Sequence, residues 1–448
     1  MRATQAPAVV VCTILFFCAA MPAQNKPQTQ QAPFTSFERE RAEMMLQVVA
    51  SDVKKHYYDQ KFHGLDWDAT VRDAKEKIDK STSQNTALSH IAAALIALDD
   101  SHTFFLPPSR PYIHDYGLQF QMIGDSCFVL RVRPGSDAES KGIKAGDQVL
   151  SINGFQPSRQ NLWQMEYVYQ TLRPQMGLQL DLRTPANVEH KIDAMAKFRD
   201  LKRIKDLTGE GRDDLWDLYR AGEAADRLMR ARTVEFGEDL MVLKLPVFDF
   251  NESEVQSMIG KARKYKALIM DLRENGGGRI DTLKYLAEGI FENDVKIADR
   301  VSRKDSKPLI EKFHPHNPFG GKLVVLVDSK SASASEIFAR AVQLEKRGTI
   351  VGDHSSGSVM ESLHYSYHLG QDIMVFYGAS ITEADVIMSD GKSLEHVGIT
   401  PDEAVLPTAA DMASGRDPAM ARAAEMLGVK ITPEEAGKLF PYEWPKVE

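Results

Sequence analysis

The chain has 448 residues, which is enough for two or three domains. Its hydrophobic content of 43% and charged content of 26% are those of an ordinary globular protein. The net charge is −8 and no basic tract occurs, so the composition argues against nucleic acid or an anionic membrane surface as a partner.

The N-terminus has the pattern of a secretory signal peptide. Basic Arg2 precedes an apolar run over residues 8–20, which is too short for a comfortable membrane span. We expect residues 1–23 to be removed, leaving an exported protein, periplasmic or secreted, without a membrane span. The alternative is an uncleaved N-terminal anchor.

The three cysteines indicate neither a disulfide nor a metal site. Cys12 and Cys18 leave with the predicted signal peptide, so Cys127 stands alone in the mature chain. The histidines are scattered and follow no metal-ligand spacing. We therefore expect no metal and no cofactor.

A small helical domain is predicted over residues 35–108, after a Gln- and Pro-rich linker at 24–34. Apolar residues recur at helical spacing in three segments, residues 37–56, 67–80 and 86–98. The domain ends in a polar turn that contains Ser101 and His102. A histidine in such a turn can simply cap a helix; the alternative is catalysis.

Residues 112–198 have a β-rich pattern. A predicted strand at 128–132 and a short helix around 138–141 precede the run 142–154, which ends in Asn153-Gly154, a strong hairpin signal after a strand. This order resembles a PDZ domain. The resemblance implies that Gly117 and Leu118 belong to a loop that captures a peptide carboxylate while the peptide adds as an edge strand. The alternative is a packing module that binds no peptide.

The sequence pattern changes twice after residue 198. Residues 199–232 are charged and helix-prone, and we interpret them as a helical linker or an insertion. Strands and helices then alternate over residues 233–408, which predicts a largely parallel sheet covered on both faces. Residues 409–448 form a C-terminal tail with short helical patterns.

A glycine-rich turn follows the predicted buried strand at 267–271. Gly276, Gly277 and Gly278 allow the backbone to approach a ligand closely. No Gly-Lys-Ser/Thr follows, which weakens a phosphate-loop interpretation. A plain tight turn remains the alternative.

A second turn joins the apolar strand at 323–327 to a helix. Ser333 and Glu336 have the spacing of a capping box. A hydroxyl at this position lies at a helix N-terminus, where free backbone amides can stabilise an oxyanion. The alternative is that these serines merely cap the helix.

The stretch Ser-Ala-Ser-Ala-Ser-Glu over residues 331–336 resembles the nucleophile motif of the tail-specific (C-terminal processing) peptidases and the related tricorn-core group. The resemblance implies an α/β peptidase core of the ClpP/crotonase-like type, with Ser333 as the nucleophile. It also implies an oxyanion hole formed by the amide of Gly276 or Gly277 and that of Ala334.

The candidate general base differs from that of the Ser/Lys members of that group. Their lysine lies 25 residues after the serine, which here is Ser358 (333 + 25), and a hydroxyl cannot replace an amine as base. Asp-Ser-His-Thr at 100–103 instead resembles the tricorn-type motif, with His102 as base and Ser101 in support. A closing motif places Glu395 at the site, and whether Ser101 or Glu395 orients His102 stays open.

The sequence therefore predicts a multidomain α/β protein that acts as an exported serine endopeptidase with a PDZ domain for substrate C-termini. Proteins or peptides are the expected partners, and no oligomeric state follows from the sequence. One alternative is an inactive family member that binds peptides or other ligands. Another is a processing enzyme with one narrow partner.

Overall fold

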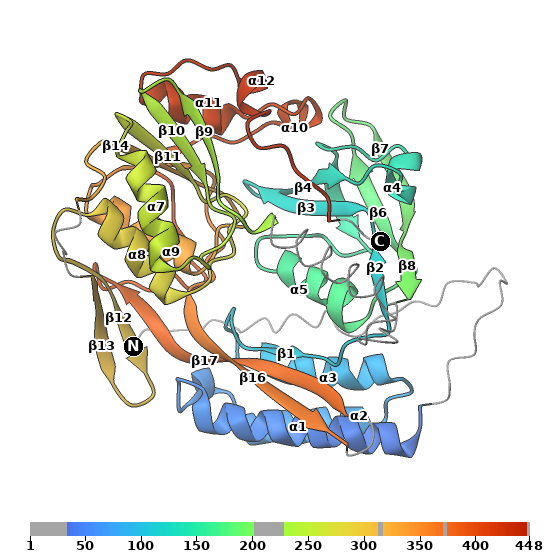
Figure 1. The fold of residues 1–448 in the computed structure, drawn as a ribbon. Helices are drawn as coiled ribbons and strands as arrows, with labels where there is room; N and C mark the ends of the chain where they lie inside the picture. The colour runs from blue at the N-terminus through green and yellow to red at the C-terminus, as the bar shows by residue number, and fades with distance from the viewer. Residues whose placement is uncertain (1–33, 201–227, 312–316, 371–373, 446–448) are drawn as a thin grey trace, which may run out of the picture.

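The computed structural model describes residues 34–200, 228–311, 317–370 and 374–445. It has a mixed α/β fold in which a helical region, a β-rich domain and an α/β core surround the centre of the molecule (Figure 1). The predicted fold class is thereby confirmed. Within these ranges no helix is long and apolar enough to cross a membrane.

The three predicted N-terminal helices form the helical region. They are α1 (Ser36–His56), α2 (Trp67–Asp79) and α3 (Gln84–Ile96), with a short 3-10 turn at Phe62–Gly64. Each helix begins at a side-chain cap, from Thr35, Asp66 and Ser83 respectively. Their apolar faces pack together in a core that includes fully buried Leu46 and Ile91.

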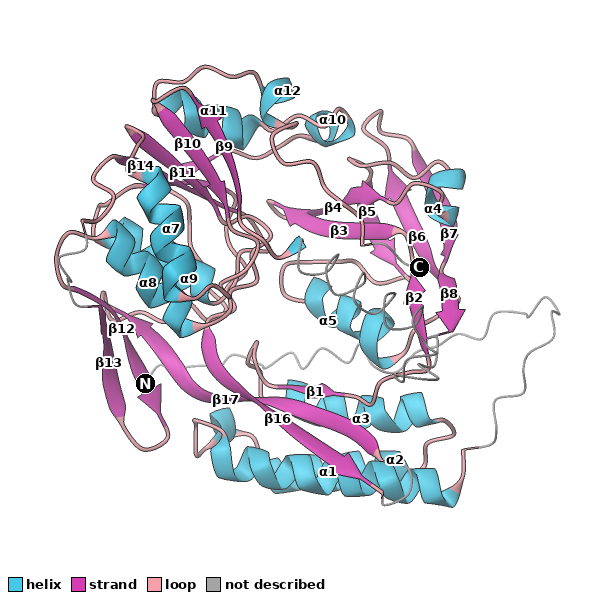
Figure 2. Ribbon diagram, in the orientation of Figure 1, coloured by secondary structure: helices cyan, strands magenta, loops and turns pink. Residues whose placement is uncertain are grey.

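A long hairpin connects the helical region to the rest of the molecule. Its strands β16 (Met360–Leu369) and β17 (Val375–Met388) lie across the helices (Figure 2). One part of β17 pairs with β1 (Phe104–Leu106), and another pairs with β12 (Val295–Ser302), which also pairs with β13 (Ser306–Glu311). The turn that carries His102 immediately precedes β1, so this pairing draws it towards the core.

The β-rich domain contains one five-stranded antiparallel sheet. Its strands, in spatial order, are β3 (Leu118–Ile123), β4 (Ser126–Val132), β5 (Gln148–Ile152), β6 (Gly177–Arg183) and β7 (Glu189–Met195). Helices α4 (Asp137–Ser140) and α5 (Leu162–Glu166) flank it, and α5 continues as a π-helix over Tyr167–Leu172. Asn153 and Gly154 have positive φ angles of 52° and 81°, as the hairpin signal predicts.

A small ribbon closes this domain. β2 (Tyr112–Asp115) pairs with β8 (Lys197–Asp200). Residues 201–227, which hold most of the predicted linker at 199–232, lie outside the described residues. Of the first and last residues of that segment, Arg199 lies in β8 and Arg232 begins a strand of the core.

The core is a six-stranded sheet of order β18-β15-β14-β11-β10-β9. Its strands are β9 (Arg232–Phe236), β10 (Leu240–Lys244), β11 (Ala267–Asp271), β14 (Lys322–Val327), β15 (Thr349–Gly352) and β18 (Glu403–Ala404). All pairings are parallel except that of β9 with β10, as the sequence pattern predicts.

Helices cover both faces of this sheet. α7 (Glu252–Ala262), α8 (Ile280–Ile290) and α9 (Ala334–Leu344) pack on one face. α11 (Pro418–Met426) packs on the other, with α10 (Ala409–Ala413) and α12 (Pro433–Ala436) beside it (Figure 1). The carboxyl ends of β11 and β14 therefore open at the same edge, where both predicted functional turns lie.

Candidate active site

Ser333 lies in a strained turn between β14 and α9. Its φ of 56° and ψ of −122° are unusual for a residue with a side chain. Its amide donates to the carbonyl of Ser358 at 2.8 Å, which fixes the turn against the loop that follows β15. The turn has the capping-box arrangement with Glu336 that the sequence predicts, but no side-chain hydrogen bond caps the helix end among the described residues.

Glu336 is the anchor beneath this turn. Its carboxylate is fully buried and accepts four hydrogen bonds, from the Ser333 amide (3.0 Å), the Ser355 hydroxyl (2.6 Å), the Gly357 amide (2.8 Å) and the Ser358 amide (3.0 Å). Burial raises the pKa of Glu336 to about 7, and these hydrogen bonds oppose the rise. The contact between the Ser333 amide and Glu336 that a capping box predicts is thus present. The same carboxylate also binds the loop at residues 355–358.

The glycine-rich turn after β11 lies directly against the serine turn. At Gly277, where φ is +91°, an added Cβ would come within 2.6 Å of the Ser333 Cβ. The Gly277 amide donates to the Asn275 side chain at 2.8 Å and is therefore engaged. The amides of Gly276 and Ala334 make no hydrogen bond with any described residue, so these two remain available to an oxyanion.

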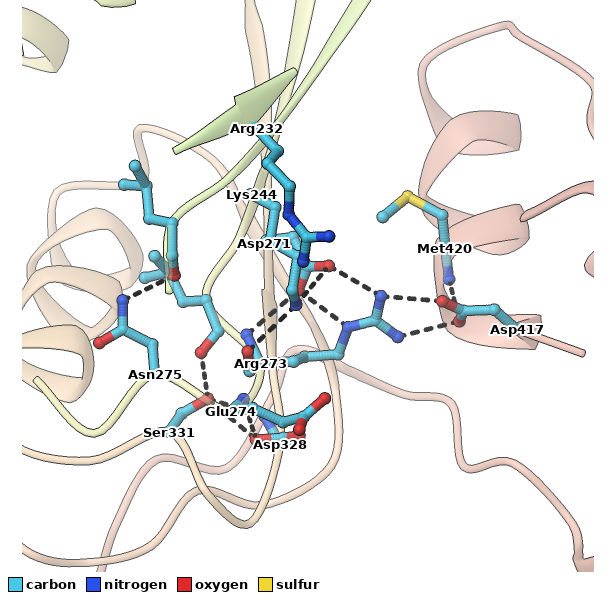
Figure 3. A network of polar contacts seen from close by, with 12 residues as sticks. Arg232, Lys244, Asp271, Arg273, Glu274, Asn275, Asp328, Ser331, Asp417 and Met420 are labelled. Atoms are coloured by element: carbon cyan, nitrogen blue, oxygen red, sulfur yellow. Dashed lines mark hydrogen bonds and ion pairs between the residues drawn. The ribbon is translucent and has the colours of Figure 1, made fainter. Parts of the chain in front are cut away.

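Charged residues hold this glycine turn in place (Figure 3). The Arg273 guanidinium bonds to Asp271 at the end of β11 (2.9 Å) and to Asp417 before α11 (2.8 Å). Buried Asp328, just after β14, accepts the amides of Glu274 and Lys330, each at 3.0 Å. The glycine turn and the serine turn are therefore connected to each other through Asp328, and the glycine turn is connected to the start of α11 through Asp417.

His102 belongs to a second cluster, with Ser101 and Glu395. The Ser101 hydroxyl lies 2.7 Å from the His102 Nδ1 and donates to Glu395 Oε2 at 2.9 Å. A hydroxyl that donates its one proton to a carboxylate can only accept from the imidazole. The contact therefore selects the tautomer with hydrogen on Nδ1 and leaves Nε2 as the basic nitrogen.

Asp100 fixes the backbone of this cluster. Its Oδ1 accepts the amides of His102 (2.9 Å) and Thr103 (2.7 Å) and the hydroxyl of Thr382 on β17 (2.7 Å). Burial lowers the pKa of His102, which keeps the imidazole neutral near pH 7. A neutral ring is the form that can accept a proton.

The two clusters are joined through residues 358–359. Glu395 Oε2 accepts the Val359 amide at 2.7 Å, and the Ser358 carbonyl accepts the Ser333 amide at 2.8 Å. The Ser358 hydroxyl bonds only to that of Ser356 at 2.9 Å among the described residues. The structure thus brings the segments of Ser333, Glu395 and His102 together, with a serine where the Ser/Lys members have lysine.

The β-rich domain contacts the same two turns. Gln121 of β3 donates to Asp328 at 2.7 Å, and Arg131 of β4 forms a two-pronged pair with Glu274 at 2.6 Å. Burial alone would raise the pKa of Glu274, but the hydrogen bonds and the charge of Arg131 have the larger effect and lower this pKa to about 2.

The two predicted peptide-binding residues lie in different settings. Leu118 lines a cavity of ≈ 380 Å³, whereas the Gly117 amide donates to Asp115 at 2.7 Å.

Several site residues were missed from the sequence. The Asp-Ser-His-Thr motif contained Asp100, and the capping-box spacing contained Glu336, so a signal existed for both. Asn275 belonged to the glycine-rich stretch that the sequence singled out, whereas no local pattern marked Val359 or Lys330. Within the described part of the chain, no group of His, Cys, Asp and Glu side chains could hold a metal ion.

Comparison with known proteins identifies the two domains that carry these clusters. Residues 239–405 match the model of peptidase family S41, and residues 113–180 match that of the PDZ domain. The fold and the matches define two domains, a PDZ domain over residues 113–180 and a domain over residues 239–405 that is similar to family S41 peptidases. The predicted resemblance to the tail-specific peptidases is therefore confirmed.

Two relatives and one solved structure illustrate the similarity. The tail-specific protease of Haemophilus influenzae is 27% identical over 291 residues, which cover 61% of this chain but only 39% of that protein. The chloroplastic C-terminal processing peptidase of Tetradesmus obliquus is 26% identical over 384 residues, or 80% of this chain and 76% of the relative. The photosystem II D1 C-terminal processing protease shares the fold, with a TM-score of 0.50 at 20% identity over 81% of this chain and 93% of its own.

Proposed function

We propose that this protein is an exported serine endopeptidase in which Ser333 is the nucleophile and His102 the general base. The observation that carries the proposal is the Ser101 hydroxyl between His102 Nδ1 and Glu395, because it leaves the far nitrogen of the ring unprotonated. A Ser/Lys mechanism does not apply, since Ser358 cannot act as an amine base.

The reaction follows from these assignments. His102 Nε2 accepts the proton as the Ser333 Oγ attacks the carbonyl carbon of the scissile peptide bond. The amides of Gly276 and Ala334 stabilise the resulting oxyanion, and one such donor is typically worth about 3 kcal/mol. The imidazolium then protonates the leaving amine, and a water activated by His102 hydrolyses the acyl-enzyme.

Ser101 and Glu395 have distinct roles in this scheme. Ser101 contacts the imidazole directly and orients it, and Glu395 orients Ser101 and compensates the imidazolium charge through the shared hydroxyl. Positioning of this kind matters because proton transfer requires the base and nucleophile to keep one geometry throughout the reaction.

The substrates we propose are unstructured C-terminal tails of proteins or peptides, bound first by the PDZ domain. The names of the relatives, tail-specific protease and C-terminal processing peptidase, support this assignment. Export to the periplasm or the medium is proposed from the signal-peptide pattern of residues 1–23.

A serine-directed fluorophosphonate tests the catalytic proposal. The probe should label the folded protein at Ser333, as identified by mass spectrometry of tryptic peptides, and label neither the Ser333→Ala variant nor heat-unfolded protein. The Ser356→Ala variant, which alters an exposed serine in the facing loop, should still be labelled. Absence of labelling in the folded protein would favour a peptide-binding protein without catalysis.

A further inference from the structure

A groove in the PDZ domain ends against the nucleophile turn. It is the cavity of ≈ 380 Å³, lined by Leu118 and Gln119 of β3, by Glu166, Tyr167 and Gln170 of the helical wall, and by Lys330. Lys330 comes from the peptidase core and lies three residues before Ser333. A peptide in this groove would therefore contact both domains.

The glycine loop at the start of β3 is poorly suited to bind a carboxylate. The Gly117 amide, which such a loop would direct at the anion, donates instead to Asp115 Oδ1 at 2.7 Å. The Asp115 carboxylate is also paired with Arg133 at 2.6 Å, so that cation is already neutralised. An incoming carboxylate would meet a negative charge at this position, which disfavours binding there.

Lys330 provides the positive charge that the glycine loop lacks. Its backbone is fixed, because its amide donates to Asp328 at 3.0 Å and the neighbouring Ser329 hydroxyl donates to the Met122 carbonyl on β3. Its ammonium forms no hydrogen bond or ion pair with a described residue. A partly buried cation is screened by solvent less than an exposed one, which strengthens its attraction for an anion.

Glu166 lies across the groove from β3 and has the opposite charge. Its carboxylate forms no hydrogen bond with a residue in the described ranges. Burial raises the pKa of Glu166, and the charge of Lys330 opposes that rise, so the two side chains influence each other. Glu166 therefore weakens the attraction of the groove for anions while Lys330 supplies it.

We infer that Lys330 is a specificity-determining residue that binds the terminal carboxylate of a peptide in this groove. The ligand class is a peptide with a free, unmodified C-terminus. The inference rests on the proposed function, since it names the group by which the substrate is recognised. It also places the substrate terminus beside the segment that carries the nucleophile.

Fluorescence anisotropy on the full chain with Ser333→Ala tests the inference without cleavage. The probes are fluorescein-labelled ten-residue peptides with different apolar C-terminal residues, each made as the free acid and as the amide. We expect the acid to bind about tenfold more tightly than the amide. Lys330→Gln should abolish this difference, and Glu166→Gln should strengthen binding of the acid severalfold.

Lys322→Gln is the matched control, because Lys322 is exposed at the opposite end of β14. It should leave the preference for the acid unchanged. Equal binding of acid and amide by the parent protein, no binding of any free acid, or a preference that survives Lys330→Gln would overturn the inference. A Lys330-dependent preference in a protein that a fluorophosphonate does not label would refute the catalytic proposal alone.

Discussion

The Ser101 amide donates to the carboxylate of Glu395 at 2.7 Å, across a separation of 294 residues. The same carboxylate accepts the Ser101 hydroxyl and the Val359 amide. Glu395 thereby holds the turn of His102 against the loop that contacts the nucleophile turn. In the proposed mechanism this carboxylate connects the base to the nucleophile segment, and its bond with the Ser101 hydroxyl fixes the protonation of the base.

Replacement of Ser101 tests the orientation of the base. Ser101→Ala removes the group that accepts from His102 Nδ1, so the ring can rotate or change tautomer. We expect kcat to fall about 10²-fold with little change in KM. Ser101→Thr keeps the hydroxyl and should retain most of the activity. Equal loss in both variants, measured with a quenched fluorescent peptide, would show that packing rather than the hydroxyl matters.

The two neighbouring glycines form a natural pair of variants. Gly277→Ala places a Cβ within 2.6 Å of the Ser333 Cβ at a φ of +91°, so the serine turn must move. We expect activity to fall by about 10²-fold or more and stability by about 1–3 kcal/mol. Gly276→Ala meets no atom within 4 Å and keeps its amide, so activity should stay within about threefold of wild type. Similar activities for the two variants would contradict the proposed packing.

The pH dependence of activity tests the role of Glu336. Four donors surround its carboxylate, so the observed turn requires the ionised form. Because the pKa of Glu336 is raised to about 7 while that of His102 is lowered, the acid limb of kcat/KM should lie near pH 7. An acid limb below pH 6 would show that protonation of His102, and not of Glu336, causes the loss of activity at low pH.

The raised pKa of Glu336 should also make the free energy of unfolding depend on pH. The folded protein binds the Glu336 proton more tightly than the unfolded chain, so this group favours folding below pH about 4.5 and loses that effect as pH rises to about 7. The free energy of unfolding of wild type, relative to Glu336→Gln, should fall by about 3 kcal/mol across this range. Urea titrations of both proteins at several pH values measure this difference. A difference that does not change with pH would show that the pKa of Glu336 is not raised in the folded protein.

Restoring lysine at position 358 should not restore a Ser/Lys enzyme. The backbone of Ser358 is held by Glu336 and Ser333, and the site is arranged around His102 instead. We expect Ser358→Lys to leave peptide cleavage unchanged or lower, and His102→Ala with Ser358→Lys to be as inactive as His102→Ala alone. A rate gain of more than about tenfold in the double variant would support a lysine base.

Much of the fold could be read from local patterns. The three helices at the N-terminus, the Asn153-Gly154 hairpin and the parallel core strands each follow from hydrophobic period and turn chemistry over short windows. The long β16–β17 hairpin was not predicted, because half-exposed strands such as β16 carry a weak pattern. Their partners β1 and β12 are also remote in sequence.

The sequence by itself determined the two functional turns, since a strand, a small-residue turn and a helix are specified by adjacent residues such as Ser333 and Glu336. Only the tertiary structure decided that His102, Ser101 and Glu395 contact one another, which glycine amide is free and that Lys330 lines the PDZ groove. Each of these depends on contacts between segments far apart in the chain. Such contacts are fixed by packing and by the pairing of buried polar groups, which no local window contains.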